Sequence, residues 1–376
     1  MRYRGTRVDE IIAAGSGRVH IRDGASLDAR ITTLPAPLHE VRLRSAAYLN
    51  VAPEEPVVMT ELLQHYHRVS RHHVVPRNVL RPPGLAVYTA RYHPRRLRYD
   101  ADACTRVVAH LIERPRAVAA QFSAAALLGI TDFADSADTA LLGPFNRRIT
   151  DDVTVPSVRR EAADLPTWTL RLGERTLRTT PPMLTLAHCL RAVLDSEHAW
   201  STPAGLSPHP ATIRGVQLID RFRREFGLTA DHIAEALHGL IAQRTLTRLL
   251  ALSDAGADSP PETVMRLVAR EAAPHLEWCP QVPVYTDGSV GAPGTRDPGR
   301  TLLTVLDLAA TACRRFLYYD GDHHLDRSQR DRDSAILAQL TVWNWTGLRV
   351  TAGMLADVRH LNALVRALTY PRVLSA

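Results

Sequence analysis

The segment FLYYDGDHHLDRSQRDRD, residues 316–333, places carboxylates and imidazoles directly after a run of aromatic and aliphatic residues. An apolar strand that ends in Asp320 and Gly321, and is followed by His323 and His324, would hold these groups at the edge of a sheet. Oxygen ligands of this kind suit a hard divalent cation such as Mg²⁺ or Mn²⁺. The segment therefore predicts a metal site at a strand end.

A second carboxylate, Asp307, lies inside the apolar run TLLTVLDLAA, residues 301–310. Burial of this side chain without a partner would be costly, so something must compensate for it. Because Asp320 ends the neighbouring strand, we expect the two carboxylates to approach each other and share the cation. Metal-bound water, or a nearby histidine acting as base, would then supply the nucleophile for attack on a phosphodiester.

Each candidate residue also has a purely structural interpretation. Asp307 is compatible with a buried aspartate satisfied by backbone donors, and Asp320 with a turn-forming Asp-Gly pair. His323 and His324 are compatible with a solvated loop. Glu262 falls in the first turn of an expected helix, where an acidic side chain is stabilising because of the helix dipole alone.

The elements that must position these groups can be read from residue 259 onward. SPPETVMRLVAREA, residues 259–272, begins with Ser and Pro and predicts a helix. Three extended segments, a helix, a strand and a final helix are expected in turn at 276–286, 300–309, 314–321, 328–343, 345–351 and 354–368. Asn344 directly follows the helix expected at 328–343, where asparagine suits the left-handed residue past a helix end. This order predicts an α/β domain with a mixed sheet flanked by helices.

These residues resemble an actinobacterial domain-of-unknown-function family related to very short patch repair endonucleases, within the PD-(D/E)XK nuclease superfamily. The resemblance covers residues 259–370 and rests on Glu262, VLDLA with Asp307, YYDGDHH, Arg332–Asp333 and NWTGLRVT. It implies a restriction-endonuclease-like fold and metal-dependent DNA cleavage. The catalytic residues that it implies are Glu262, Asp307, Asp320, His323 and His324.

One position departs from the family pattern. Tyr318 stands where members usually place Glu, but the repair endonucleases carry an aromatic residue there and remain active. By that precedent Asp307 and the Tyr319 carbonyl would be the metal ligands, with His323 or His324 as the candidate base. The strand-end position of Asp320 makes it a third candidate ligand. The superfamily's usual Lys is also absent, because the chain has no lysine. A catalytically inactive, antitoxin-like DNA-binding regulator is therefore the alternative to an endonuclease or nickase.

A basic segment precedes this region. The chain has 376 residues, a formal net charge of +7 and a pI near 9.6, which favours a polyanionic partner. Residues 65–99 contain eight arginines and no acidic residue, interleaved with tyrosines. Arginines neutralise phosphates while aromatic rings stack on bases, although a solvated basic face is the plainer interpretation. The predicted nucleic-acid contacts are Arg68, Arg71, Arg77, Arg81, Arg91, Arg95, Arg96 and Arg98.

The chain length predicts two or three domains. We expect a basic region at 1–100, an α+β domain at 101–252 and the endonuclease-like domain at 259–376. Within the first, a helix from Thr60 followed by an extended LAVYTA, residues 85–90, is compatible with a small winged-helix-like unit. The segments LAVYTARY, AQFSAAALLGI and LRTTPPMLTLAHCLR, within residues 60–250, resemble an AbiEi-type antitoxin region. This resemblance implies DNA binding and a toxin-like protein partner. RNA remains an alternative ligand, because arginine and tyrosine contacts do not distinguish the sugars.

Other compositional signals are negative. No run of the sequence approaches the roughly 18 apolar residues of a membrane span, so we expect a cytoplasmic protein without a membrane partner. The four cysteines show no paired spacing suited to zinc or a redox dithiol. Nucleophile-elbow, phosphate-loop, HExxH and dinucleotide-binding motifs do not occur.

Overall fold

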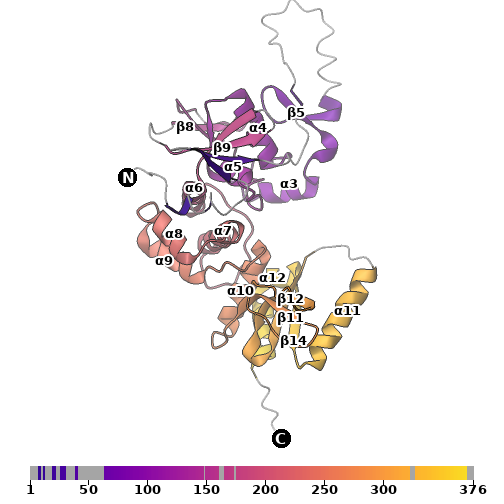
Figure 1. Ribbon diagram of the computed structural model, residues 1–376. Coiled ribbons are helices and arrows are strands. Elements are labelled where there is room, and N and C mark those ends of the chain that lie inside the picture. Colours follow the sequence, from indigo (N-terminus) through magenta and orange to yellow (C-terminus); the bar gives the residue numbers. More distant parts are fainter. Residues whose placement is uncertain are drawn as a thin grey trace, which may run out of the picture. The chain divides into compact units, whose positions relative to one another are not determined.

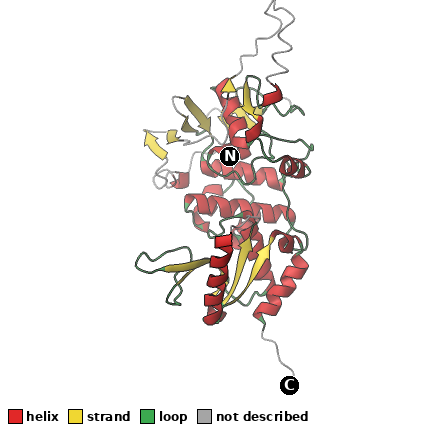
Figure 2. Cartoon of the chain, turned by 90° about the vertical axis from the view of Figure 1, so that its right-hand side faces the viewer, coloured by secondary structure: helices red, strands yellow, loops and turns green. Residues whose placement is uncertain are grey.

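The structure is a computed structural model that describes residues 7–9, 12, 19–22, 26–30, 39–40, 63–147, 149–160, 165–172, 175–321 and 327–370 (Figure 1). The chain forms two compact units. Unit 1 comprises Met1–Ser201 and Glu225–Thr247, and unit 2 comprises Thr202–Arg224 and Arg248–Ala376. Both units combine helices with β-sheet (Figure 2), so the predicted α/β class is confirmed. The three-part division at 1–100, 101–252 and 259–376 stays a prediction.

The described strands of unit 2 form a four-stranded sheet, ordered β11-β12-β13-β14. Its first three strands are antiparallel neighbours, and β14 runs parallel to β13. The predicted order of helices and strands is confirmed, except that the last helix is two, because Asp357 ends one and caps the next. The elements are α10 (Pro260–Ala272), β11 (Cys279–Tyr285), β12 (Leu302–Ala310), η3 (Thr311–Cys313), β13 (Arg315–Asp320), α11 (Arg327–Val342), β14 (Thr346–Thr351), α12 (Ala352–Ala356) and α13 (Val358–Thr369).

The sheet of unit 2 has an apolar core on each face. On one face Leu308, Leu317 and Val350 pack with the apolar sides of α10 and α13. On the other face Leu306 and Phe316 pack with residues of α11 and with Trp345. The sheet is therefore buried on both sides, and a polar side chain in it needs a partner.

Strand β12 is irregular at Asp307. Leu306 and Leu308 belong to the cores on opposite faces, although residues two apart in a regular strand point to the same face. The ladder pairs Pro280 with Leu308 and Val282 with Leu306, so Gln281 lies opposite Asp307. Gln281 has φ +51°, the left-handed conformation that residues other than glycine seldom adopt. The two strands thus change face together at one point.

Helix α10 is anchored by a buried ion pair with α7 (Pro210–Phe226). Arg266 Nη2 lies 2.5 Å from Asp220 Oδ2, and both side chains are at most 2% exposed. Thr263 Oγ1 and the Asp254 backbone N–H also donate to the Asp220 carboxylate. Removing one member of such a pair typically costs about 3–5 kcal/mol, because the other charge remains buried. The pair fixes the helix that carries Glu262.

The connection between α11 and β14 has the conformation that the sequence predicts. Asn344 has φ +61°, so the expected left-handed residue after the helix is confirmed. The parallel register then places Gly347 beside Phe316 and Arg349 beside Tyr318. A side chain at Gly347 would overlap the Phe316 ring, which explains the glycine.

Unit 1 contains a seven-stranded sheet ordered β1-β2-β9-β10-β6-β7-β8 and a three-stranded sheet ordered β3-β5-β4. Helices α4, α5 and α6 each contribute several of its buried apolar residues. Its strands are β1 (Val19–Arg22), β2 (Ser26–Arg30), β3 (His39–Glu40), β4 (Tyr66–Arg68), β5 (His73–Pro76), β6 (Val118–Ala119), β7 (Ala140–Gly143), β8 (Ser157–Arg160), β9 (Trp168–Leu172) and β10 (Arg175–Thr179). Its helices are η2 (Arg77–Val79), α3 (Pro83–Ala90), α4 (Ala103–Glu113), α5 (Gln121–Leu127), α6 (Pro182–Leu194) and α8 (Ala230–Leu237), and α9 (Gln243–Leu252) crosses the division between the units.

The extended segment predicted at 85–90 is wrong. These residues belong to helix α3, which begins with Pro83 at its first turn. Proline at this position is pre-organised for a helix and outweighs the strand preference of Val87, Tyr88 and Thr89. The correction removes the strand on which the winged-helix interpretation depended.

We predict that Gly347→Ala destabilises the protein by about 1–3 kcal/mol, the usual cost of overpacking a core. The new Cβ would lie 2.4–2.5 Å from three ring carbons of Phe316, and the buried ring has little room to move. Gly353→Ala is the matched control, since its nearest neighbour would lie 3.8 Å away. Urea unfolding of both variants measures the difference, and equal midpoints would contradict the predicted packing.

Candidate functional site

Asp307 and the backbone of Tyr319 meet where β12 and β13 separate. The last registered pair between these strands joins Leu308 to Leu317. Beyond it, the Tyr319 N–H donates to Asp307 Oδ2 over 2.7 Å. Two of the three predicted metal-binding residues are therefore adjacent.

Burial raises the pKa of Asp307 to about 7, the largest effect on this group. The hydrogen bond from the Tyr319 N–H opposes the shift, because it stabilises the ionised form. The negative charges of Glu262 and Asp258 add smaller contributions to the shift. A cation at this point would relieve both the repulsion and the loss of solvation.

Glu262 is held by three donors. Its Oε2 accepts hydrogen bonds from the Asp258 N–H at 3.0 Å and from Gln281 Nε2 at 3.1 Å, and its Oε1 accepts one from Ser259 Oγ at 2.8 Å. Burial nevertheless raises the pKa of Glu262. Glu262 is thus a fixed, half-buried carboxylate rather than only a solvated residue in a first helical turn.

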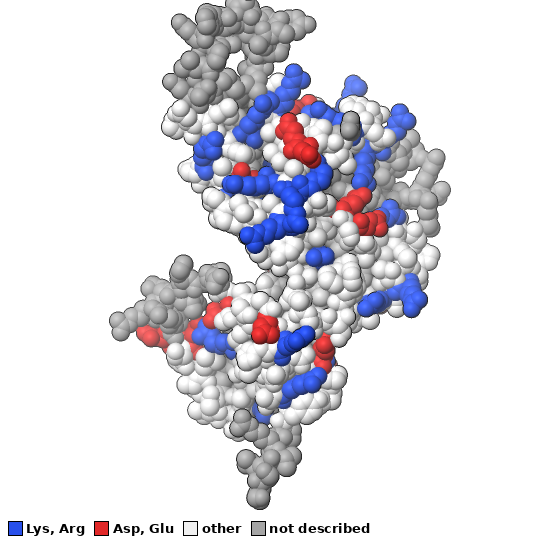
Figure 3. All heavy atoms as spheres, turned by 180° about the vertical axis from the view of Figure 1, so that it is seen from behind, with Lys and Arg blue, Asp and Glu red and all other residues white. Residues whose placement is uncertain are grey.

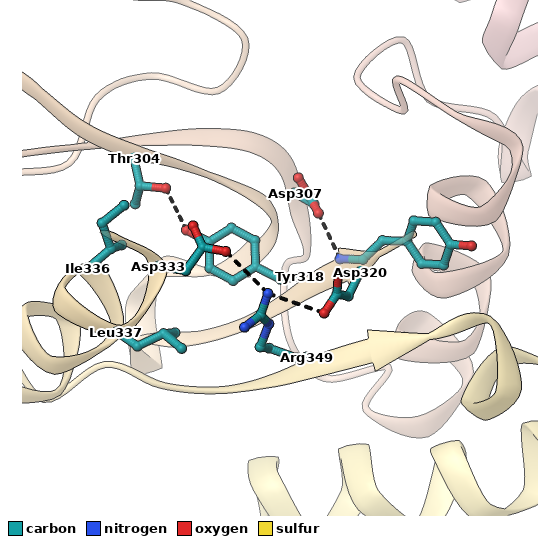
Figure 4. Close-up of a pocket in the computed structure, with 9 residues that line it drawn as sticks. Thr304, Asp307, Tyr318, Asp320, Asp333, Ile336, Leu337 and Arg349 are labelled. Atoms are coloured by element: carbon teal, nitrogen blue, oxygen red, sulfur yellow. Dashed lines mark hydrogen bonds and ion pairs between the residues drawn. The ribbon is translucent and has the colours of Figure 1, made fainter. Parts of the chain in front are cut away.

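Asp320 points to a different partner. Its Oδ2 lies 3.1 Å from Arg349 Nη2, and the same nitrogen lies 3.3 Å from Asp333 Oδ2. Figure 4 shows the Asp320 and Asp333 carboxylates turned toward Arg349, while Asp307 is turned toward the backbone after Tyr318. The expected sharing of a cation between Asp307 and Asp320 would require Asp320 to leave this ion pair.

Asp307, Asp320 and Arg349 line a pocket of about 230 Å³ in unit 2 (Figure 4), whereas Glu262 is not among its lining residues. The Tyr318 hydroxyl and Thr304 Oγ1 are 2.7 Å apart on one wall. Burial raises the pKa of the Tyr318 hydroxyl, so it stays protonated and can donate a hydrogen bond. The lining residues are Thr304, Asp307, Tyr318, Tyr319, Asp320, Asp333, Ile336, Leu337 and Arg349.

The remaining predicted site residues are only partly testable. His323 and His324 fall in 322–326, outside the described residues. Among the residues that the structure does describe, no group of three or more His, Cys, Asp or Glu side chains is arranged to hold a metal ion. A cation here would therefore depend on few protein ligands, as Mg²⁺ often does when it keeps several waters.

The arginines of residues 65–99 separate into two groups. Three of them pair with carboxylates that come later in the chain. Arg81 pairs with Asp135, Arg95 with Asp138 and Asp151, and Arg98 with Asp100. The Arg81 side chain is only 8% exposed, so it serves the fold of unit 1.

The other five arginines make local backbone contacts or are exposed. Arg68 donates to the carbonyls of Ser70 and Arg71, and Arg77 donates to that of Leu63. Arg71 and Arg91 are exposed, as is Arg96, which also bonds the Arg91 carbonyl. Figure 3 shows arginine side chains spread over one face of unit 1 with few acidic groups among them.

Two residues of the site were missed from the sequence. Arg349 lies in the NWTGLRVT motif but was not assigned a role, because its neighbours depend on the parallel register of β13 and β14. Gln281 lies in an apolar, proline-containing strand, and only its left-handed backbone and its bond to Glu262 identify it. A lone polar residue between Pro280 and Val282 was the available signal.

Comparison with known proteins adds no relative. A scan of family models finds no match to the chain, and searches of curated proteins and of solved structures find none either. Over the part of the chain that the structure describes, no helix has the length and apolar character needed to cross a membrane.

We predict that Asp307→Asn stabilises the folded protein at alkaline pH. The raised pKa means that the folded state loses stability as pH rises from about 4, the unfolded value, through about 7. The variant should exceed the wild type by about 1–3 kcal/mol near pH 8, below the full value of the shift because the side chain is only partly buried. The free energies of unfolding of the variant and the wild type should converge at about pH 4.

Urea unfolding across this pH range measures the effect. Asp331→Asn is the matched control, since Asp331 is exposed and lies outside the pocket. A wild type and Asp307→Asn that differ by the same amount at every pH would contradict the assigned burial of the carboxylate.

Proposed function

We propose that the protein is a divalent-metal-dependent phosphodiesterase that cleaves or nicks DNA, with a restriction-endonuclease-like core in unit 2. The order of elements supports this: a helix, three antiparallel strands, a crossover helix and a strand parallel to the third. This order resembles the core of the PD-(D/E)XK nucleases. The likeness concerns the arrangement of strands, and the chemistry must be argued from the site.

The observation that best supports this proposal is the hydrogen bond between the Tyr319 backbone and the Asp307 carboxylate. The 2.7 Å bond from the Tyr319 N–H to Asp307 joins the strand-two carboxylate to the residue whose carbonyl is the proposed second ligand. Gln281, which lies between the ladder pairs that flank Asp307, bonds Glu262, and the charge of Glu262 contributes to the raised pKa of Asp307. Two carboxylates and one carbonyl are enough protein ligands for Mg²⁺ or Mn²⁺ that also binds waters and a phosphate.

The protein residues have distinct roles in this proposal. Asp307 and the Tyr319 carbonyl would hold the cation, and Glu262 would hold it directly or through water. A bound cation supplies a water of lowered pKa and neutralises charge that develops on the phosphate. Tyr318, whose hydroxyl stays protonated, could donate a hydrogen bond to a phosphate oxygen. His323 or His324 remains the proposed base.

A second function is favoured by Arg349. Its guanidinium bridges Asp320 and Asp333 on one side of the pocket, and Tyr318 stands where a third carboxylate is usual. A protein with this arrangement would bind DNA without cleaving it, as an antitoxin-like regulator with a toxin-like partner. The two functions differ in whether the protein cleaves bound DNA when a divalent cation is present.

We predict that Asp307→Asn abolishes cleavage while DNA binding persists. The wild type should nick or cut supercoiled duplex DNA with Mg²⁺ or Mn²⁺, and the variant should be slower by at least about 10²-fold, because a metal-held water is lost. Gel analysis of plasmid topology gives the rate, and a mobility-shift assay gives binding. Asp331→Asn should cleave like the wild type.

The regulator would be the better assignment under a different result. A wild type that binds duplex DNA with equal affinity in chelator and in Mg²⁺, and leaves the plasmid intact, would contradict the enzyme. Cleavage that survives in Asp307→Asn would contradict the proposed site.

We predict that the triple change Arg71→Gln, Arg91→Gln and Arg96→Gln weakens duplex binding by about 10–100-fold at about 0.1 M salt. The plot of log affinity against log salt has a negative slope, and each lost phosphate contact should reduce the magnitude of that slope by about 0.9. Fluorescence anisotropy with labelled duplexes measures both quantities, and the same sequences as RNA test the sugar preference.

The matched control removes the same charge elsewhere. Arg244, Arg248 and Arg359 are exposed and lie outside residues 65–99. Equal losses in the two triple variants would mean that only net charge matters, and the arginine face of unit 1 would then have no special part in binding.

A further inference from the structure

Gln281 has an unusual backbone for its place in the sheet. It lies within β11, yet its φ of +51° is left-handed, where the Cβ of an ordinary residue is crowded. Strand residues normally avoid this conformation, and the chain could relieve the strain with glycine. Such strain persists where the surroundings or the function require the side chain.

The surroundings compensate only part of this strain. The Gln281 carbonyl accepts a hydrogen bond from the Gly294 N–H at 2.8 Å. That contact involves the backbone alone, so a glycine at 281 could make it equally well. The long side chain therefore needs a separate explanation.

The side chain contacts the proposed cation site. Gln281 Nε2 donates to Glu262 Oε2 over 3.1 Å, and the register of β11 and β12 puts Gln281 opposite Asp307. The opposing strand is irregular at the same point, since Leu306 and Leu308 join cores on opposite faces. Both distortions thus centre on the two carboxylates.

We propose that Gln281 is a positioning residue that orients Glu262 toward the cation site shared with Asp307. The inference rests on the proposed metal-dependent function and adds a residue to it. An amide donor suits this role, because it holds a carboxylate without adding charge, whereas an arginine or lysine would compete with the cation. Partners of ligating groups typically change metal affinity by about 10–100-fold when they are removed.

The test is Mn²⁺ binding to the full chain, measured by the electron paramagnetic resonance signal of free Mn²⁺. Gln281→Gly removes the amide and also the backbone strain, so we expect about 10-fold weaker Mn²⁺ affinity with a melting temperature within about 3 °C of the wild type. Asn344→Gly is the matched control. It relieves the same kind of strain in unit 2, at φ +61°, away from the carboxylates, and should leave Mn²⁺ affinity unchanged.

A double-mutant cycle separates positioning from a general loss of structure. If Gln281 acts through Glu262, then Gln281→Gly should cause no further loss of Mn²⁺ affinity in the Glu262→Ala background. Independent losses that multiply in the double variant would overturn the inference, as would wild-type affinity in Gln281→Gly alone.

The failures of the two proposals are distinguishable. If Mn²⁺ does not bind the wild type more tightly than Asp307→Asn, the metal-dependent function fails, and the role of Gln281 fails with it. If Asp307→Asn weakens binding and Gln281→Gly does not, only the role of Gln281 is lost.

Discussion

A carboxylate in the middle of a sheet that is buried on both faces is the constraint on which unit 2 depends. Asp307 lies between Leu306 and Leu308, which are at most 1% exposed. Its described donor is one backbone N–H, and the nearby acidic charges oppose its ionisation. An apolar residue would avoid this cost, so the arrangement is typical of positions retained for chemistry. The left-handed Gln281 of β11 and the irregular part of β12 lie at the same point of the sheet as this carboxylate.

The acidic centre also needs a rigid frame. Glu262 must come from a helix that packs on the sheet, and the buried pair of Arg266 with Asp220 fixes that helix one turn away from Glu262. Strand β11 contributes Gln281, whose backbone is left-handed and whose side-chain amide bonds the Glu262 carboxylate. The position of Glu262 is therefore set by contacts outside the pocket, whereas Asp307 is held by the Tyr319 N–H on the pocket wall.

Arginine has several structural roles in this lysine-free chain. A planar guanidinium with many donors can bridge two carboxylates, as Arg349 does, or satisfy buried carbonyls, as Arg81 does. A basic composition therefore overstates the charge available to an outside partner. Only the exposed members of the 65–99 segment, such as Arg71 and Arg91, combine charge with access to solvent.

The sequence by itself determined the order of helices and strands in unit 2, the left-handed Asn344 and the presence of Asp307 in a buried strand. These features follow from local signals: apolar periodicity, proline at helix starts and the need of a polar group for a partner. Only the tertiary structure decided that Asp320 pairs with Arg349, that Gln281 meets Glu262 and that Arg95 pairs with Asp138 and Asp151. Each of these contacts joins residues far apart in the chain, and strand register and helix packing, which no local pattern encodes, bring them together.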